Sequence, residues 1–250
     1  YEDAERKETL LDLCRFSTNE NDKPISLSEY LEKMPDNQKD IYYISAETNA
    51  QALASPHLEG FKSKKIPVLI MTDAIDQFWL PMIGSFKEKK FTSITQGKIN
   101  LDDLNSKDKD KKSDNKDQKE KQDKEYVDLI AQFKVVLGEQ VKDIRLSSKL
   151  TDSPVCLVAD EGDMDIAMEQ LMAQRDTNYK GAPRILEING DHSLIKNMKS
   201  LISKKENNDL VNDAGTLLFE QARLMEGKLP ADPAQFSKIM NQFLLKAIPN

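Results

Sequence analysis

Carboxylates and histidines are the side chains of this sequence that could carry acid and base chemistry. Asp73 and Asp76 follow an apolar run, a spacing compatible with paired carboxylates that act as acid and base or as ligands. No arrangement of His, Lys or Ser stands near them to complete such a site. We therefore favour the simpler interpretation, in which the two aspartates cap the turn after a strand.

Histidine is scarce, because the chain contains only His57 and His192. His57 lies on the apolar face of a predicted helix, where a packed core histidine is more common than a catalytic one. His192 falls in the first turn of a later predicted helix. We assign no catalytic residue.

Phosphate-binding and metal-binding motifs are missing. The nine glycines are widely spaced, the closest pair being Gly181 and Gly190, so no glycine-rich phosphate loop can be formed. An acidic cluster at residues 160–165 lacks the glycine of a calcium-binding loop and opens a predicted helix, whose dipole favours acids at that end. We predict no metal site.

Composition indicates a globular protein in a reducing compartment. The chain has 250 residues, of which 38% are hydrophobic, and 36 basic against 43 acidic residues give a net charge of −7, which argues against a nucleic-acid surface. No apolar run approaches the roughly 20 residues of a membrane helix. Cys14 and Cys156 lie in apolar runs without a C-x-x-C partner, so we expect buried, reduced thiols in a cytoplasmic protein.

The first part of the chain predicts a small αβα sandwich. A charged helix over residues 1–16 and a helix over 26–34 precede two apolar runs, 41–45 and 68–71, which predict buried strands. Between the strands we expect two short helices, the second starting at Pro56 after a Ser55 cap. The strands are too far apart for a hairpin, so a parallel crossover is predicted. Phe78 and Trp79 would follow in an exposed turn.

Residues 105–125 mark the predicted domain boundary, because they include no apolar residue that could offset the cost of ordering the segment. We therefore divide the chain into domains 1–104 and 126–250, joined by a charged linker. The second domain is predicted to be α+β. It starts with a helix that Gly138 ends, has strands at 141–146, 155–159 and 184–188, and continues with a helix capped by Asp191.

A helix is predicted after Gly162, capped by Asp163. Three of the chain's nine methionines fall on one stripe of this helix, Met164, Met168 and Met172. Such a stripe usually faces a core. Methionine enrichment also suits a surface that accepts many partners, because the side chain is flexible and polarizable. The residues alone leave both interpretations open.

The last part of the chain predicts two amphipathic helices. One ends at Gly227, and Asp232 and Pro233 open the other. Both apolar stripes are wide, so they must be buried either on the chain's own strands or against a second copy in a four-helix bundle. The stripe residues that would form the dimer interface are Leu210, Leu217, Leu218, Phe236, Ile239, Met240, Phe243 and Leu244.

Several segments resemble one family of chaperones. These segments are IYYI, SPHLEGF, VLIMTDAIDQFW and LGEQVKDIRLSSKLTDSPVCLV. In order and spacing they are similar to the bacterial HtpG branch of the heat shock protein 90 chaperones. The resemblance implies the end of the middle domain, a linker and the C-terminal dimerisation domain. The ATP-binding N-terminal domain would lie outside this sequence, so we expect no ATPase activity and no bound ATP or magnesium here.

The resemblance also implies partners. It implies a homodimer that binds unfolded or partly folded client proteins, without nucleic acid or a membrane. We expect no docking of tetratricopeptide co-chaperones, because the sequence ends without the acidic tail of the eukaryotic relatives. The client-binding residues implied at matching positions are Phe78, Trp79, Met164, Met168, Leu171 and Met172.

Two other classes of function remain as alternatives. One is an α/β enzyme or small-molecule-binding domain with a site near Asp73 and Asp76, at the carboxyl end of the predicted strands. The other is a structural dimerisation adaptor, in which the methionine stripe is core.

Overall fold

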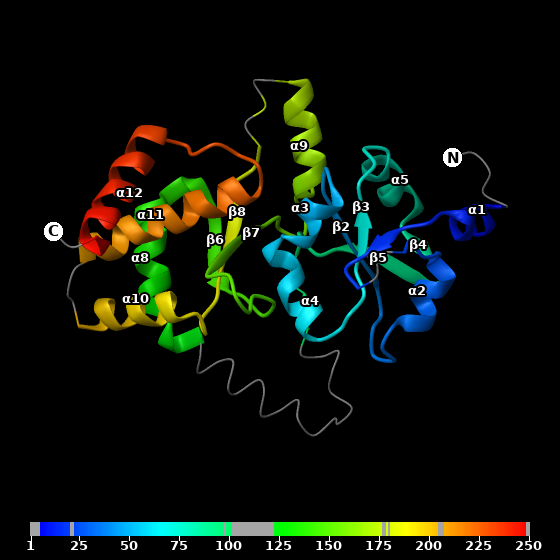
Figure 1. The fold of residues 1–250 in the computed structure, drawn as a ribbon, viewed down its shortest axis with the longest axis horizontal. Helices are drawn as coiled ribbons and strands as arrows, with labels where there is room; N and C mark the ends of the chain where they lie inside the picture. Colours follow the sequence, from blue (N-terminus) through cyan, green and yellow to red (C-terminus); the bar gives the residue numbers. More distant parts are fainter. Residues whose placement is uncertain are drawn as a thin grey trace. The chain divides into compact units, whose positions relative to one another are not determined.

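The chain folds into two compact units in the computed structural model, which describes residues 6–20, 23–97, 99–101, 123–176, 179, 181–204 and 208–248 (Figure 1). The first unit is drawn from residues 1–107 and 159–182, and the second from 108–158 and 183–250. The chain thus enters the second unit, returns to the first and leaves it again. Most of the predicted linker at 105–125 lies outside the described residues.

The first unit is built on a five-stranded sheet of order β1-β3-β2-β5-β4. Its strands are β1 (Ser17–Thr18), β2 (Ile41–Ser45), β3 (Leu69–Met71), β4 (Ser85–Phe86) and β5 (Lys89–Ser93). β2 pairs in parallel with β3, with Ser45 opposite Met71, which confirms the predicted crossover. β5 pairs in parallel with the other edge of β2, and β1 and β4 run antiparallel at the sheet edges.

The crossover contains short helices, as predicted. They are α3 (Asn49–Leu53), the 3-10 helix η1 (Pro56–Leu58) and α4 (Glu59–Ser63). Ser55 caps η1, its hydroxyl accepting a hydrogen bond from the His57 backbone N–H at 3.3 Å, and Pro56 takes the first helical position. The His57 side chain is buried.

Helices cover both faces of this sheet. Alternate residues of each strand point to opposite sides, so each face has its own set of packed side chains. Tyr42 and Ile44 pack with Phe61 of α4 on one face. Ile41 and Leu69 pack on the other face with Tyr30. The helices on that second face are α1 (Lys7–Leu13), α2 (Leu27–Lys33) and α5 (Asp76–Ile83). The first unit is therefore an αβα sandwich.

The second unit contains a three-stranded sheet of order β6-β8-β7. Its strands, β6 (Val141–Leu146), β7 (Val155–Val158) and β8 (Arg184–Ile188), lie where the sequence predicts them. β8 pairs in parallel with β6 and antiparallel with β7. A 3-10 turn, η2 (Gly138–Gln140), precedes β6. The helices α8 (Val127–Leu137), α10 (Ser193–Ser203) and α11 (Asn208–Met225) share one core with the sheet.

Two local predictions need correction. His192, not Asp191, caps α10, because its Nδ1 accepts a hydrogen bond from the Leu194 N–H at 3.1 Å. Cys156 is buried as expected, but Cys14 is exposed, because it follows the last turn of α1 and lies outside its buried face.

The packing of α11 on α8 is close. A Cβ atom on Gly215 of α11 would lie 2.9 Å from the Phe133 ring of α8, so glycine lets the two helices approach. Leu218 and Phe219 of α11 are buried in the same core. α11 is therefore an integral part of the second unit's fold.

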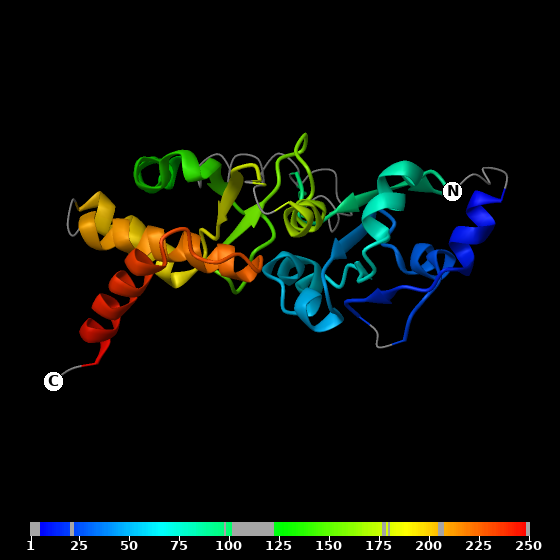
Figure 2. The same cartoon turned by 90° about the horizontal axis from the view of Figure 1, so that it is seen from above.

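The last helix, α12 (Pro233–Ala247), contacts α11 and extends away from the rest of the second unit (Figure 2). Asp232 caps it as predicted, accepting hydrogen bonds from the Ala234 and Gln235 backbones. Within this fully described helix, Ile239 is the one buried residue. The pair of helices predicted at the end of the chain is present.

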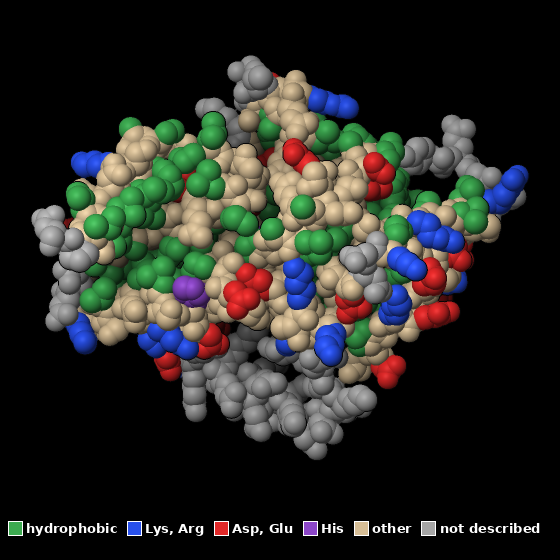
Figure 3. Space-filling model, in the orientation of Figure 1, with side chains coloured by type: hydrophobic (Ala, Val, Ile, Leu, Met, Phe, Trp, Pro, Cys, Tyr) green, Lys and Arg blue, Asp and Glu red, His purple; other side chains and the backbone are tan. Residues whose placement is uncertain are grey.

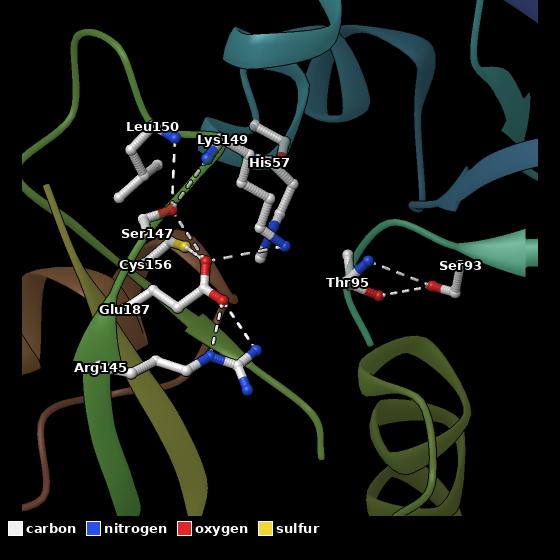
Figure 4. Close-up of polar contacts among 10 residues, drawn as sticks. His57, Ser93, Thr95, Arg145, Ser147, Lys149, Leu150, Cys156 and Glu187 are labelled. Carbon is white, nitrogen blue, oxygen red and sulfur yellow. Dashed lines mark hydrogen bonds and ion pairs between the residues drawn. The ribbon is translucent and has the colours of Figure 1, made fainter. Parts of the chain in front are cut away.

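A buried carboxylate, that of Glu187, lies on the second unit's sheet. It is on the face that points away from α8, α10 and α11. Both guanidinium nitrogens Nε and Nη2 of Arg145 donate to Glu187 Oε1, at 3.0 and 2.8 Å (Figure 4). Ser147 donates to Glu187 Oε2 at 2.9 Å, and the Lys149 ammonium lies 4.0 Å from the same oxygen. Glu187 is 4% exposed and Lys149 is 2% exposed, so these two groups are almost completely removed from water, whereas the Arg145 side chain is 21% exposed.

Within the part of the chain that the structure describes, no helix is both long and apolar enough to cross a lipid bilayer.

Candidate functional site

The aromatic pair Phe78 and Trp79 lies in a helix, not in the predicted exposed turn. α5 runs from Asp76 to Ile83 and contains Pro81. Proline removes a backbone donor and disfavours a helix interior, so the sequence pattern argued against a helix here. The helical geometry sends the two neighbouring aromatic side chains in different directions.

Trp79 is a core residue. It is 8% exposed, and its ring lies 6.2 Å from that of Phe16 and 5.8 Å from that of Phe91. The Trp79 indole N–H donates to Asp76 Oδ1 at 2.7 Å, and the Asp73 backbone N–H donates to Asp76 Oδ2 at 3.3 Å. Burial raises the pKa of the Asp76 carboxyl above its usual value. Asp76 therefore supports the start of α5 and does not form an open pair with Asp73.

The outer side of α5 carries a row of exposed apolar side chains. Ile75, Phe78 and Met82 are 51%, 39% and 69% exposed. Their spacing of three and four residues places them on one helical face. Of the predicted aromatic pair, Phe78 is thus the member that faces solvent.

The methionine-bearing helix α9 (Ile166–Arg175) belongs to the first unit. Its cap is Asp165 and not Asp163, so Met164 precedes the helix. Asp165 Oδ1 accepts from the Ala167 N–H at 2.9 Å, while Oδ2 accepts from the hydroxyls of Ser93 at 2.5 Å and Thr95 at 2.9 Å. Ser93 ends β5 and Thr95 lies close after it (Figure 4), so they tie the start of α9 to the first unit's sheet.

The buried side of α9 is not its methionine side. Ile166 and Glu169 are the buried residues of the helix, and the Glu169 carboxylate accepts from the Ala182 N–H at 3.1 Å. Met164 and Met172 are 39% and 41% exposed. The remaining predicted positions, Met168 and Leu171, are half-buried.

α5 and α9 are neighbours within the first unit. The Arg175 guanidinium of α9 lies 6.0 Å from the ring centroid of Phe78 on α5. A hollow of about 130 Å³ is lined by Gln77 of α5 and by Leu171 of α9, among others. We call six exposed or half-buried apolar residues in or next to the two helices the α5–α9 surface. Its members are Ile75, Phe78, Met82, Met168, Leu171 and Met172.

The second candidate surface lies on α11 and α12. Two of the predicted interface residues, Leu218 and Ile239, are each 4% exposed in the single chain. Met240 and Leu244 are 40% and 49% exposed. The remaining predicted positions are half-buried: Leu210, Leu217, Phe236 and Phe243.

Further apolar side chains enlarge this second surface. Leu229 is 79% exposed, Leu245 77% and Ile248 68%. Hydrophobic side chains accordingly gather over the helices of the second unit in the space-filling view (Figure 3). The sequence pattern did not single out Leu229, because it lies between the two helical stripes.

Among the residues that the structure describes, no group of three or more His, Cys, Asp and Glu side chains is placed to hold a metal ion. Asp160, the first of the acidic cluster, accepts a hydrogen bond from the next backbone N–H, that of Glu161, at 2.8 Å. Asp165, the last, is the helix cap described above.

The sequence as a whole matches a known family. The family model described as Hsp90 protein matches residues 1–249, so the chain belongs to the Hsp90 family. Within it, the chain is 39% identical to the Chaperone protein HtpG of Roseobacter denitrificans over 249 residues, which are 99% of this chain and 40% of the relative. This places the chain among the bacterial HtpG-like members.

Other curated relatives agree. The Chaperone protein HtpG of Paramagnetospirillum magneticum is 39% identical, covering 99% of this chain and 39% of the relative. That of Streptomyces coelicolor is 36% identical, covering 95% and 36%. The chain therefore spans about two fifths of the length of the curated relatives it matches. These relatives are chaperones by name.

Proposed function

We propose that this part of the chaperone binds unfolded or partly folded client proteins on the α5–α9 surface and dimerises through α11 and α12. The observation that carries the proposal is the exposure of large apolar side chains on elements whose opposite sides are packed. Such exposure commonly marks an interaction site on a soluble domain.

The chemistry of the α5–α9 surface suits varied clients. Phe78 supplies a rigid aromatic contact, whereas Met82 and Met172 can adapt their shape to different apolar partners. A surface of this composition favours promiscuous binding over recognition of one fixed partner.

The second candidate surface, on α11 and α12, suits a second copy of the chain. A helix that buries Ile239 alone while it leaves Met240 and Leu244 open gains little stability from its own unit. Pairing α11 and α12 with the same helices of a second copy would form a four-helix bundle with a two-fold axis. We propose this homodimer as the assembly.

The enzyme alternative is not favoured. It requires Asp73 and Asp76 to act together, and Asp76 is already engaged by the Trp79 indole and the Asp73 backbone. The adaptor alternative requires the methionine side of α9 to be core, whereas Met172 is 41% exposed.

If clients bind to the α5–α9 surface, the double variant Phe78→Ser and Met172→Ser should have a lower affinity for unfolded proteins. The double variant should bind an unfolded model protein at least about fivefold more weakly, because truncation of an apolar anchor costs ~1 kcal/mol or more, a factor of about five, and the two costs need not add. Its thermal midpoint should stay within a few degrees of the parent, because both residues are exposed. Titration of a permanently unfolded, fluorescently labelled protein measures the affinity.

Leu13→Ser with Val135→Ser is the matched control for this experiment. Both residues are exposed apolar side chains, at 68% and 78%, outside the α5–α9 surface. The control should bind like the parent chain. Equal affinity for the Phe78 and Met172 variant and the parent would refute the assigned surface, and an equal loss in the control would indicate unspecific apolar binding.

A further inference from the structure

We propose that the hollow between α5 and α9 receives a lysine or arginine side chain of an extended client segment, whose neighbouring apolar residues lie on the α5–α9 surface. The inference rests on the proposed client binding and specifies which segments are preferred. It follows from the position, size and lining of the hollow.

The hollow lies where the two central parallel strands of the first unit end. Ser45 ends β2 and Met71 ends β3, and both line it together with residues of the segments that follow. Its volume of about 130 Å³ is close to that of a ~150 Å³ cavity able to admit one benzene ring. It is smaller than the ~300 Å³ or more of a typical small-molecule site. One side chain of a client therefore fits it better than a drug-sized ligand.

The lining combines an apolar wall with acidic groups. Met71 is buried and Leu171 half-buried, and both contribute apolar surface. Glu47 and Asp73 also line the hollow, and both are exposed. Among the described residues that line it, these two carry the only formal charges. A lysine or arginine side chain matches this arrangement, because its aliphatic stem packs on apolar atoms while its cationic end stays near water and the carboxylates.

The position of the hollow links this preference to the apolar contacts. Gln77 lines it and is followed directly by Phe78 of the α5–α9 surface. Leu171 lines it and is followed directly by Met172. A client segment that places an apolar residue on Phe78 or Met172 thus brings its next residues to Glu47 and Asp73. The preferred segment pairs an apolar residue with a neighbouring basic one.

Labelled peptides with one shared Leu and Phe core and flanking residues of Lys, Ser or Glu test this inference on the complete chain. Fluorescence anisotropy should show about five- to tenfold tighter binding of the Lys peptide than of the Glu peptide, because exposed ion pairs are individually weak. The double variant Glu47→Gln and Asp73→Asn should reduce that ratio to about twofold and leave binding of the Ser peptide unchanged.

Glu32→Gln with Asp36→Asn is the matched control, since it makes the same change in net charge at two exposed carboxylates outside the hollow. The control should keep the full Lys to Glu ratio. An equal ratio in the control and the Glu47 and Asp73 variant would overturn the inference, because the preference would then follow net charge alone. If the Ser peptide binds but Lys and Glu peptides bind alike, this inference alone fails. If no peptide binds, the proposed client binding fails with it.

Discussion

Replacement of Glu187 by alanine should lower the free energy of unfolding of the second unit by about 3–5 kcal/mol. The carboxylate accepts two hydrogen bonds from Arg145 and one from Ser147, and the Lys149 ammonium lies 4.0 Å away. Removal of the carboxylate takes the negative charge away from the Lys149 ammonium, which is 2% exposed, and from the partly exposed Arg145 guanidinium. Desolvated charge without its counter-ion is among the most destabilising changes that a single substitution can make.

Urea denaturation followed by far-UV circular dichroism measures this loss. Trp79 emission assigns the transitions, because the sole tryptophan lies in the first unit. The double variant Glu187→Ala and Lys149→Met should recover part of the stability, since it removes one of the buried cations and fills its space with an apolar side chain. A loss below about 1 kcal/mol for Glu187→Ala would show that water reaches the cluster and screens it.

Leu218→Ala should destabilise the second unit by about 2–5 kcal/mol, because its side chain is 4% exposed and packs in the core shared by α8, α11 and the sheet. The lost methyl groups leave a cavity that Phe133 and Phe219 cannot fill without moving. Thermal or urea unfolding measures the change.

Val135→Ala is the control for that experiment. Val135 is also a branched aliphatic residue but is 78% exposed on α8, outside the proposed dimer surface, so its replacement should change the free energy of unfolding by less than about 0.5 kcal/mol. Equal effects of the two substitutions would contradict the assignment of Leu218 to the chain's own core.

Apolar patterning was sufficient to predict most of the regular elements. β6 and β8 lie within the predicted limits, and so does the crossover between β2 and β3. β8 is buried along its whole length, and the crossover helices α3 and η1 begin at clear caps, so local sequence and tertiary packing favour the same structure.

The strands at the margin of the first sheet could not be predicted in the same way. β4 and β5 are joined at Lys87 and Glu88, both with positive φ, and neither is the glycine or asparagine that usually marks such a turn. β5, with the sequence KKFTS, presents mainly polar residues, so it gave no hydrophobic pattern. Its pairing with β2 is a tertiary contact.

The sequence pattern did not separate exposed from buried members of the candidate site. Phe78 and Met172 are exposed, as client contact would require, but Trp79 is buried. The grouping of residues 159–182 with the first unit was missed, because it depends on contacts between distant segments, such as the hydrogen bonds from Ser93 and Thr95 to Asp165. A linear division of the chain at 105–125 could not include such a return.

Dimerisation through α12 is tested most directly by sedimentation of the chain over a range of micromolar concentrations, beside the variant Met240→Lys with Leu244→Lys. Gln235→Lys with Gln242→Lys on the same helix is the control for added charge. We expect the parent and the control to sediment with twice the 28.4 kDa chain mass, and the Met240 and Leu244 variant to be a folded monomer. A parent chain that is monomeric throughout, or a variant that dimerises as tightly as the parent, would rule out dimerisation through α12.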